Sequence, residues 1–368
     1  MGSNPIRGTK KNMNFKKTLE KLKKEIDQEL DKYLAGAICD AEKQDKEMGR
    51  ILRHAAKIIM ASGKRIRPIL MYFGYVAAGG KDRKKIIKTS VGIELIHNYL
   101  LIHDDIMDHG RTRHGIETVD AMYETMGKNI FPDCQDLKHL GNSMAILAGD
   151  LLESLGTQSI VDSGFDAKLT VKAVSALQST IATTIVGQTQ DICIENKKRV
   201  LEKEVLTMYK NKTAKYTIEN PLKIGAILAG ADAKFLQKIS LFAIPVGMAF
   251  QIQDDILGLF ETSEKMGKDA GSDVKEGKKT ILVLRAMEKA GREEGKFMRN
   301  VLGNEKINLK DIKKFQNIVQ KTGALEYSQN LAENLVEKGK AEIETFKINK
   351  EAKVFLLELA DYMIARRV

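Results

Sequence analysis

Two aspartate clusters, each placed after an apolar stretch with helical spacing, constrain this chain most. One is the D-D-I-M-D sequence at residues 104–108, and the other is the D-D-I-L-G sequence at residues 254–258. Carboxylates are costly to bury without partners, so both clusters are expected to line a polar site. On a helix, Asp104 and Asp108 lie one turn apart and share a face. Two such faces opposite each other would form an all-oxygen cage, which suits Mg²⁺ holding a diphosphate better than a softer metal.

The composition favours one large helical domain. The chain has 368 residues with 5 Pro and no Trp, and Leu, Ile, Ala, Lys and Glu recur at helical spacing. We expect a single all-α domain over residues 14–368, after a flexible leader or expression remnant at residues 1–13. The 3 cysteines are scattered and odd in number. They predict reduced thiols in a cytoplasmic protein rather than a disulfide frame.

The net charge of +11 would suit a polyanionic partner. Basic runs interleaved with aromatic residues are absent, so a small polyanionic molecule is favoured over nucleic acid. The longest uncharged run, residues 173–190, is rich in Ser, Thr and Gln. It predicts a buried helix and not a membrane span. We therefore expect no nucleic-acid partner and no stable membrane insertion.

Helical periodicity organises most of the chain, and no alternation long enough for a β-strand is present. Residues 120–140 contain Gly127 and Pro132 and have no clean period, which predicts an inserted loop with a short helix. A loop rich in Gly and Lys is expected at residues 262–280. Helices are expected near residues 14–60, 70–76, 84–109, 141–193, 201–219, 221–231 and 234–260, and beyond the Gly- and Lys-rich loop.

Three further segments carry residue types that bind phosphates. Residues 63–68 (G-K-R-I-R-P) place three cations at the start of a helix, where phosphates are bound well. Lys212-Thr213 lies near a helix boundary, and the glycines of residues 262–280 let the backbone approach a ligand closely. Each segment taken alone is also typical of a solvated surface, and the spacing of a P-loop is absent.

Histidines around the first cluster raise the alternative of a zinc site. Four of the 6 His, at positions 97, 103, 109 and 114, fall within 18 residues. His97 and His103 are six residues apart and do not share a helix face. The H-E-x-x-H pattern is also absent, so zinc is disfavoured.

Together and in order, these motifs resemble those of the trans-isoprenyl diphosphate synthase (polyprenyl synthetase) family, of the farnesyl/geranylgeranyl type and archaeal-like. The resemblance extends from about residue 45 to the C-terminus. It implies the all-α isoprenoid synthase fold, an orthogonal helical bundle around a deep central cavity. The motifs are G-K-R-x-R-P at 63–68, D-D-x-x-D at 104–108, G-D at 149–150, G-Q-x-x-D at 187–191, K-T at 212–213, F-Q-x-x-D-D at 250–255 and G-K-D…G-K-K-T at 267–280.

The resemblance implies a Mg²⁺-dependent head-to-tail (1'-4) condensation of isopentenyl diphosphate with an allylic diphosphate. The allylic C–O bond ionises, the double bond of isopentenyl diphosphate attacks the cation, and a proton is lost to the departing diphosphate. The leaving group gathers negative charge, so it needs preorganised Mg²⁺ ions (about three per site) and cations. The implied metal ligands are Asp104 and Asp108 with Asp254 opposite, while Asp105, Asp191 and Asp255 serve as secondary ligands or supports.

The remaining site residues are also assigned by the resemblance. One group holds the allylic diphosphate, a second holds isopentenyl diphosphate, and a third steadies the carbocation. The first group is Arg113, Lys212 and Lys268, with Lys278 at the mouth; the second is Lys64, Arg67 and His97; the third is the Lys212 carbonyl, Thr213 and Gln251.

The chain departs from the family pattern next to the first cluster. Arg113-His114-Gly115 stands where the family has R-R-G, so His114 replaces an arginine that grips isopentenyl diphosphate. A neutral imidazole is a poorer phosphate partner than a guanidinium, although Arg111, three residues earlier on the same helical side, could substitute. Glu117 also stands where the family has proline. These changes bear on affinity for isopentenyl diphosphate rather than on the fold.

Product length in this family depends on side chains just before the first cluster. Tyr99 and Leu100 lie five and four residues before Asp104. One Tyr turn with a Leu neighbour resembles the archaeal geranylgeranyl pattern, so a C20 product is expected, with C15 as a second product. Tyr99 is also compatible with a simple role in the core.

Two other functions remain open. A class I terpene cyclase shares the fold and the first cluster, but its second metal motif differs and the basic loop at residues 63–68 favours chain elongation. A non-catalytic subunit of a heteromeric synthase fits the changes at His114 and Glu117, but it has no need of both aspartate clusters. The family resemblance also implies a homodimer.

Overall fold

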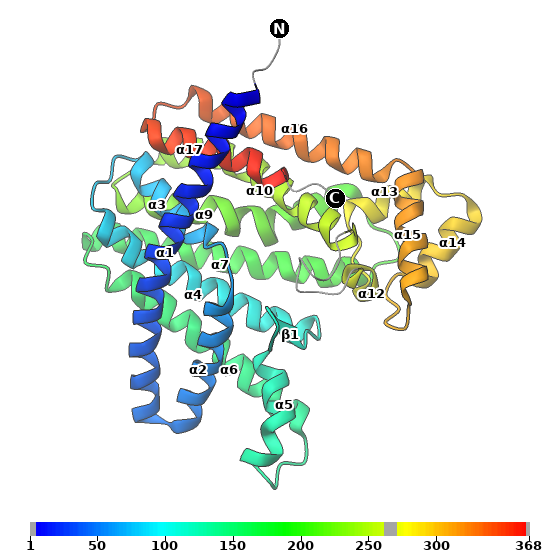
Figure 1. Cartoon of the computed structure of the whole chain (residues 1–368), viewed down its shortest axis with the longest axis horizontal. Coiled ribbons are helices and arrows are strands. Elements are labelled where there is room, and N and C mark those ends of the chain that lie inside the picture. The colour runs from blue at the N-terminus through cyan, green and yellow to red at the C-terminus, as the bar shows by residue number, and fades with distance from the viewer. Residues whose placement is uncertain (1–4, 261–270, 366–368) are drawn as a thin grey trace. The chain divides into compact units, whose positions relative to one another are not determined.

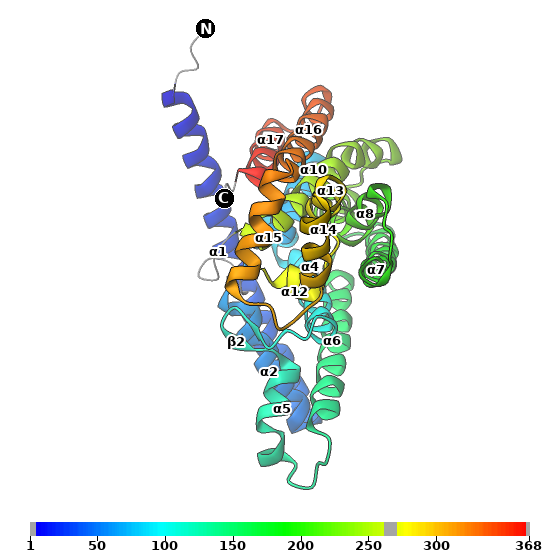
Figure 2. The same cartoon turned by 90° about the vertical axis from the view of Figure 1, so that its right-hand side faces the viewer.

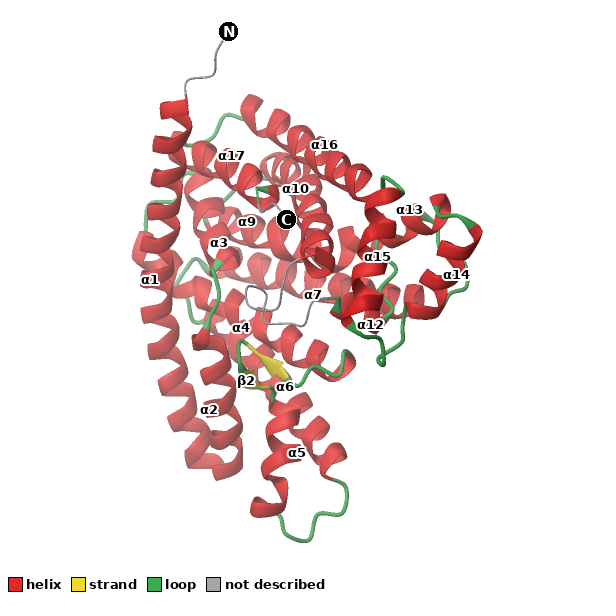
Figure 3. Cartoon of the chain, turned by 45° about the vertical axis from the view of Figure 1, so that its right-hand side comes forward, coloured by secondary structure: helices red, strands yellow, loops and turns green. Residues whose placement is uncertain are grey.

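The computed structural model describes residues 5–260 and 271–365 of the chain. Nearly all of these residues are helical, which confirms the predicted all-α fold (Figures 1 and 3). The strands within the described ranges form one antiparallel pair, β1 (Thr112–Arg113) and β2 (Ile116–Glu117). Each strand has 2 residues, too few for the alternation on which a sequence-based strand prediction depends.

The described residues form two units, and contacts are dense within each. One unit is the chain up to Val76 with Gly80–Val174, and the other is Ala77–Gly79 with the chain from Ser175 onward. The expectation of a single domain over residues 14–368 stays a prediction. The first helix begins at Pro5, so residues 5–13 are helical, and their assignment to a leader or expression remnant stays a prediction.

The first unit places a long central helix, α4, against its neighbours α6 and α1. Asp82 caps α4 by accepting the N–H of Lys85 at 3.0 Å, which fixes where this helix begins. Glycines allow α4 and α6 to approach closely: a Cβ at Gly92 would lie 2.5 Å from the carbonyl oxygen of Gly156. The helices are α1 (Pro5–Gln44), α2 (Lys46–Ala61), α3 (Ile66–Ala77), α4 (Arg83–Met107), α5 (Val119–Ile130) and α6 (Leu137–Val161).

The segment at residues 120–140 is more helical than predicted. Helix α5 occupies it as far as Ile130, and α6 begins at Leu137, capped by the side chain of Asp136. Only residues 131–136 connect the two helices. The low helical periodicity of this segment concealed α5. Gly127 lies inside this helix, where it allows close contact with Leu137 and does not break the helix.

Helix α7 (Ala167–Asn196) contains the apolar run predicted to be a buried helix. By length and composition alone, α7 and α10 (Ala233–Phe260) could cross a membrane. Only 28% of the apolar stretch of α7 is buried in the structure. The prediction that this helix is buried is therefore wrong for one copy of the chain. Ile185, Val186 and Ile192 are among the exposed apolar residues of α7.

The second unit is built around α10, which packs against α16, α17 and the π-helix η1. The π-helix follows directly after α8 and precedes Pro221 in the first turn of α9. In Figure 2, α13, α14 and α15 lie near one another in this unit. Its further elements are α8 (Glu202–Met208), η1 (Tyr209–Glu219), α9 (Asn220–Leu228), α12 (Ser272–Glu276), α13 (Ile281–Lys289), α14 (Arg292–Val301), α15 (Leu309–Lys321), α16 (Ala324–Thr345) and α17 (Lys350–Ile364).

Candidate active site

The first aspartate cluster lies at the C-terminal end of α4. The helix ends at Met107, and Asp108 donates its backbone N–H to the carbonyl oxygen of Asp104 at 2.8 Å. The α-helical geometry therefore extends over the cluster, so Asp104 and Asp108 leave the backbone one turn apart. Both residues are half-buried, which leaves their carboxylates accessible to a ligand.

Asp105, between them, has a different environment. It is 6% exposed, and its carboxylate accepts two hydrogen bonds from Arg113, at 2.9 Å from Nε and 2.6 Å from Nη2. Burial disfavours the charge of Arg113, but Asp105, followed by Asp104 and Asp108, outweighs burial and raises the pKa of the guanidinium. Asp105 therefore supports a permanently charged arginine beside the cluster.

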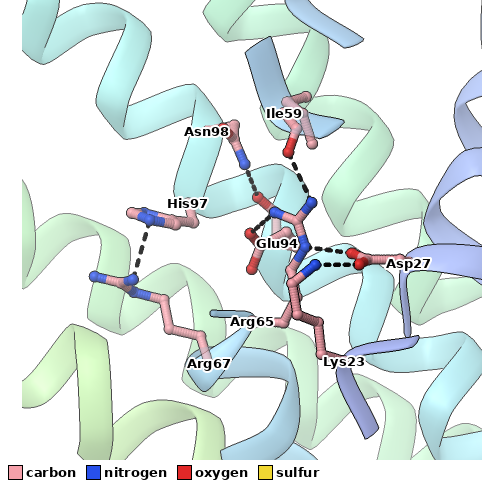
Figure 4. Close-up of polar contacts among 8 residues, drawn as sticks. All are labelled: Lys23, Asp27, Ile59, Arg65, Arg67, Glu94, His97 and Asn98. Carbon is pink, nitrogen blue, oxygen red and sulfur yellow. Dashed lines mark hydrogen bonds and ion pairs between the residues drawn. The ribbon is translucent and has the colours of Figure 1, made fainter. Parts of the chain in front are cut away.

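The predicted isopentenyl diphosphate residues lie on α3, α4 and the loops beside them. Lys64 is exposed, and the Nη1 of Arg67 lies 3.0 Å from the Nε2 of His97 (Figure 4). Burial, with the charge of Arg67, lowers the pKa of His97 well below its usual value. The imidazole is therefore neutral, and its Nε2 accepts from the guanidinium.

His114 adopts a left-handed backbone, φ 54°, in the turn between β1 and β2. Burial, and then the charges of Arg113 and Arg65, lowers the pKa of its imidazole. Arg111 and His114 do not share a helical side, because Arg111 lies just before β1 and its guanidinium pairs with Glu124 of α5. That Arg111 substitutes for an arginine at position 114 stays a prediction.

Tyr99 and Leu100 lie one helical turn before the cluster. Tyr99 is 9% exposed, and its ring meets the ring of His103 edge-on, with centroids 4.9 Å apart. Burial, and then the charges of Glu153 and Asp150, raises the pKa of the Tyr99 phenol. Leu100 is half-buried. In the G-D motif, Gly149 is required by His103, whose Nε2 would lie 2.3 Å from an added Cβ.

In the second unit, Asp191 links two of the predicted lysines. Its Oδ2 lies 2.6 Å from the Nζ of Lys212 and 3.6 Å from the Nζ of Lys278. Lys278 also lies 3.0 Å from Glu195. Burial opposes ionisation of Asp191, but the two lysines outweigh it and lower the pKa of the carboxyl. Asp191 is thus a carboxylate that holds Lys212 and Lys278 together.

The π-helix η1 contains Lys212 and Thr213, and π-helical turns occur frequently at functional sites. The Thr213 hydroxyl donates to Gln251 Oε1 at 2.6 Å, and Gln251 Nε2 donates to Asp255 Oδ1 at 2.8 Å. The hydroxyl of Tyr209 donates to the other oxygen of Asp255 and accepts from the N–H of Ile281 at 3.2 Å. The chain of bonds connects η1, α10 and the start of α13.

The two aspartates of the second cluster differ in the same way as those of the first. Asp254 is half-buried, whereas Asp255 is 6% exposed. Burial, and then the charge of Asp273, raises the pKa of Asp255 well above its usual value. Asp254 is therefore the more accessible ligand, and Asp255 is held in place by Gln251 and Tyr209.

Sequence reasoning missed two buried residues, Arg65 and Tyr209. Arg65 was grouped with the loop cations, and no sequence signal distinguishes Tyr209 from a core aromatic. Lys268 lies outside the described residues. Over residues 5–260 and 271–365, no group of three or more His, Cys, Asp or Glu side chains is arranged to hold a metal, and the histidines around α4 form no zinc site there.

The ligand chemistry of each cluster fits Mg²⁺. The first unit offers the half-buried carboxylates of Asp104 and Asp108, the second unit offers that of Asp254, and carboxylate oxygens are hard ligands. Protein sites usually hold Mg²⁺ through one or two carboxylates, and substrate phosphates and water complete the shell. Two half-buried aspartates one turn apart therefore suit an ion that arrives with a diphosphate.

Comparison with known proteins shows which family the chain belongs to. The family model described as polyprenyl synthetase matches residues 49–319. The chain belongs to the polyprenyl synthetase family. The geranylgeranyl diphosphate synthase of Saccharolobus solfataricus is 32% identical over 313 residues, which cover 84% of this chain and 88% of the relative. The short chain isoprenyl diphosphate synthase of Methanocaldococcus jannaschii is 33% identical over 342 residues, 93% of each protein.

A solved structure extends the polyprenyl synthetase relationship to the fold. The crystal structure of a geranylgeranyl pyrophosphate synthase from Corynebacterium glutamicum, complexed with isoprenyl diphosphate and magnesium, matches with a TM-score of 0.89 at 29% identity. The match covers 95% of this chain and 99% of that one. The predicted isoprenoid synthase fold is confirmed.

Proposed function

We propose that this chain is a Mg²⁺-dependent prenyltransferase that condenses isopentenyl diphosphate with allylic diphosphates and releases mainly geranylgeranyl diphosphate (C20). Farnesyl diphosphate (C15) is the second product. The observation that carries the proposal is the pair of accessible aspartates, Asp104 and Asp108, with Arg113 held beside them by buried Asp105. The name of the Saccharolobus solfataricus relative, geranylgeranyl diphosphate synthase, supports a C20 product.

The side chains of this chain divide the work of the reaction. Asp104, Asp108 and Asp254 hold the metal ions, about three of them per site, which supply positive charge to the leaving diphosphate when bound. Arg113, Lys212 and Lys278 add fixed positive charge to the allylic diphosphate, as Lys268 does in the family pattern. Because Asp105 and Asp191 fix Arg113 and both lysines, this charge needs little reorganisation.

Isopentenyl diphosphate needs basic side chains of its own, and the carbocation needs a path that excludes water. Lys64, Arg67 and His97 bind the diphosphate of isopentenyl diphosphate, and neutral His114 adds a weaker contact. The Lys212 carbonyl, Thr213 and Gln251 face the carbocation with oxygen atoms. The Thr213–Gln251–Asp255 bonds hold those oxygens in position.

The assay that tests the proposal uses the purified chain, Mg²⁺, isopentenyl diphosphate and C5, C10 or C15 allylic primers, with product length read by mass spectrometry. A C20 product that Asp104→Ala abolishes supports elongation. Cyclised hydrocarbon instead of a longer diphosphate would favour a terpene cyclase. No elongation by folded protein with any primer would favour a non-catalytic subunit.

Tyr99 sets the product length in this proposal. Its buried ring lies one turn before Asp104, where it closes the path of the growing chain. Tyr99→Ala is expected to shift the main product from C20 to C25 or longer, because a lost ring opens room for about one isoprene unit. Leu100→Ala, at the second predicted chain-length position, is expected to give a smaller shift, because a smaller side chain is lost. An unchanged product in Tyr99→Ala would reject Tyr99 as the floor.

A homodimer in the cytoplasm, without nucleic acid or stable membrane insertion, completes the proposal. The exposed apolar residues of α7 support it, because a second copy of the chain would cover them. The second aspartate cluster and the basic residues at 63–68 favour elongation over a cyclase, and the presence of both clusters argues against a subunit without catalysis.

A further inference from the structure

The basic segment at residues 63–68, which runs into the start of α3, contains three cations, and one of them is turned inward. Arg65 is 3% exposed, whereas Lys64 is exposed and Arg67 is half-buried. Arg65 also adopts a left-handed backbone, φ 52°, which is uncommon for a residue with a side chain. A conformation of this kind persists only where the surrounding contacts enforce it.

Those contacts come from three helices (Figure 4). The Nε of Arg65 donates to Asp27 Oδ1 of α1 at 2.7 Å, and Nη1 donates to Glu94 Oε1 of α4 at 2.6 Å. Its Nη2 donates to the carbonyl oxygen of Ile59, in the last turn of α2, at 2.7 Å. Only the planar fork of arginine presents donors in these three directions at once.

The charge of Arg65 is balanced by protein groups. Glu94 is 3% exposed, and Asp27 also pairs with Lys23 of its own helix. Burial disfavours the charged guanidinium, but Glu94 and Asp27 outweigh burial and raise the pKa of Arg65. Two carboxylates therefore hold this cation inside the protein, which separates it in role from its exposed neighbour Lys64.

Arg65 also fixes the start of the helix that carries Arg67. The N–H of Ile69 donates to the Arg65 carbonyl oxygen at 3.0 Å, so the first turn of α3 begins on this residue. Glu94 and His97 are three residues apart on α4 and share a face. The contacts Arg65–Glu94 and Arg67–His97 thus join α3 to α4 at two consecutive points (Figure 4).

We propose that Arg65 is a positioning residue that sets the placement of Lys64, Arg67 and His97 and thereby the affinity of the site for isopentenyl diphosphate. This inference rests on the proposed function, which assigns those three residues to that substrate. Arg65 does not contact the substrate in this proposal, since it is 3% exposed and its three nitrogens each donate to a protein group. Its loss should therefore affect one substrate and leave the other nearly unchanged.

The test is Arg65→Lys in the full chain. Lysine keeps the charge but cannot donate in three fixed directions. Binding of isopentenyl diphosphate alone is measured by isothermal titration calorimetry, and steady-state assays give KM for each substrate. We expect Kd and KM for isopentenyl diphosphate to rise about tenfold. KM for the allylic diphosphate should change by less than about twofold, with kcat within about threefold.

Arg83→Lys is the matched control. Arg83 also joins α4 to α1, through Nη2 and the carboxylate of Glu25 at 2.8 Å, but it lies outside the basic segment. Its substitution should leave the binding of isopentenyl diphosphate unchanged. If Arg65→Lys does not fold, the pair Arg65→Gln with Glu94→Gln removes both buried charges and should give the same selective loss.

The outcomes separate this proposal from the proposed function. Equal changes in both KM values, or unchanged binding of isopentenyl diphosphate with a lower Tm, would overturn a positioning role. If the chain elongates no primer but Arg65→Lys binds isopentenyl diphosphate more weakly than Arg83→Lys does, the positioning role is upheld and the proposed activity is rejected. A wild-type chain that does not bind isopentenyl diphosphate would overturn both.

Discussion

Among single residues, His114 has the clearest chemical consequence. A guanidinium makes charge-assisted bonds to a diphosphate, whereas burial and the charge of Arg113 keep this imidazole neutral. We expect His114→Arg to lower KM for isopentenyl diphosphate about fivefold with little change in kcat. Initial rates at a fixed saturating allylic primer measure the effect.

His109→Arg is the matched control for that substitution. His109 is exposed and adopts a left-handed backbone, φ 53°, like that of His114, but it lies outside the phosphate-binding pattern. It should leave KM unchanged. Equal effects of the two substitutions would show that added surface charge alone attracts the substrate, and an unchanged KM in His114→Arg would remove position 114 from the substrate site.

Gly187, the first residue of the G-Q-x-x-D motif, sits where α7 approaches η1. An added Cβ would lie 2.3 Å from the backbone nitrogen of Lys212. Gly187→Ala should therefore lower the free energy of unfolding by about 1–3 kcal/mol and reduce kcat, since Lys212 must shift. Gly36→Ala is the helical control, because nothing lies within 4 Å of its position. An active, fully stable Gly187→Ala variant would contradict this close packing.

The motif residues could be found from sequence because their chemistry is local. Asp104 and Asp108 follow from helical spacing alone. Arg65 and Tyr209 could not be found in this way. The acceptor of Arg65 on α1, Asp27, is 38 residues away, and the acceptor of Tyr209, Asp255, is 46 residues away. Their burial depends on tertiary packing, which single residue types do not encode.

At the scale of elements, the hairpin after α4 depends on one ion pair. Asp105 holds Arg113 of β1 by two bonds, and its backbone carbonyl accepts the N–H of Gly110 at 2.8 Å. Asp105→Asn keeps the shape but loses the charge and one acceptor. We expect kcat/KM for the allylic primer to fall about tenfold, because Arg113 is held less firmly.

The Mg²⁺ dependence of activity identifies the role of Asp105. A support for Arg113 should leave the Mg²⁺ concentration for half-maximal rate unchanged in Asp105→Asn. Asp104→Asn, at an accessible ligand, should raise that concentration. A similar rise in both variants would make Asp105 a metal ligand, as the family resemblance first suggested.

Helix locations were largely predictable, whereas three local features were not. The 3.6-residue period predicted a helix at residues 84–109, close to the bounds of α4, Arg83–Met107. A π-helix such as η1 has a different period, so Lys212 and Thr213 appeared only to lie near a helix boundary. The hairpin at β1 and β2 is too short for a pattern, and the burial of α7 was misjudged because apolar composition does not say which molecule covers a face.

At the scale of the whole molecule, the proposed homodimer would account for the exposed apolar residues of α7. Ile185, Val186 and Ile192 are 49%, 52% and 42% exposed on one helix, and a folded chain does not usually leave such a face in water. A second copy of the same chain would bury it by two-fold symmetry. This arrangement agrees with the homodimer proposed above.

Val186→Glu tests that partner directly. A carboxylate in a buried apolar interface is costly, whereas at a half-exposed position of a monomer it is nearly neutral. We expect size-exclusion chromatography with light scattering to give a dimer for the wild-type chain and a monomer for Val186→Glu, with helical content unchanged by circular dichroism. Val354→Glu, at a position 40% exposed on α17, should remain dimeric. A monomeric wild-type chain, or a dimer that survives Val186→Glu, would require another explanation for the apolar face of α7.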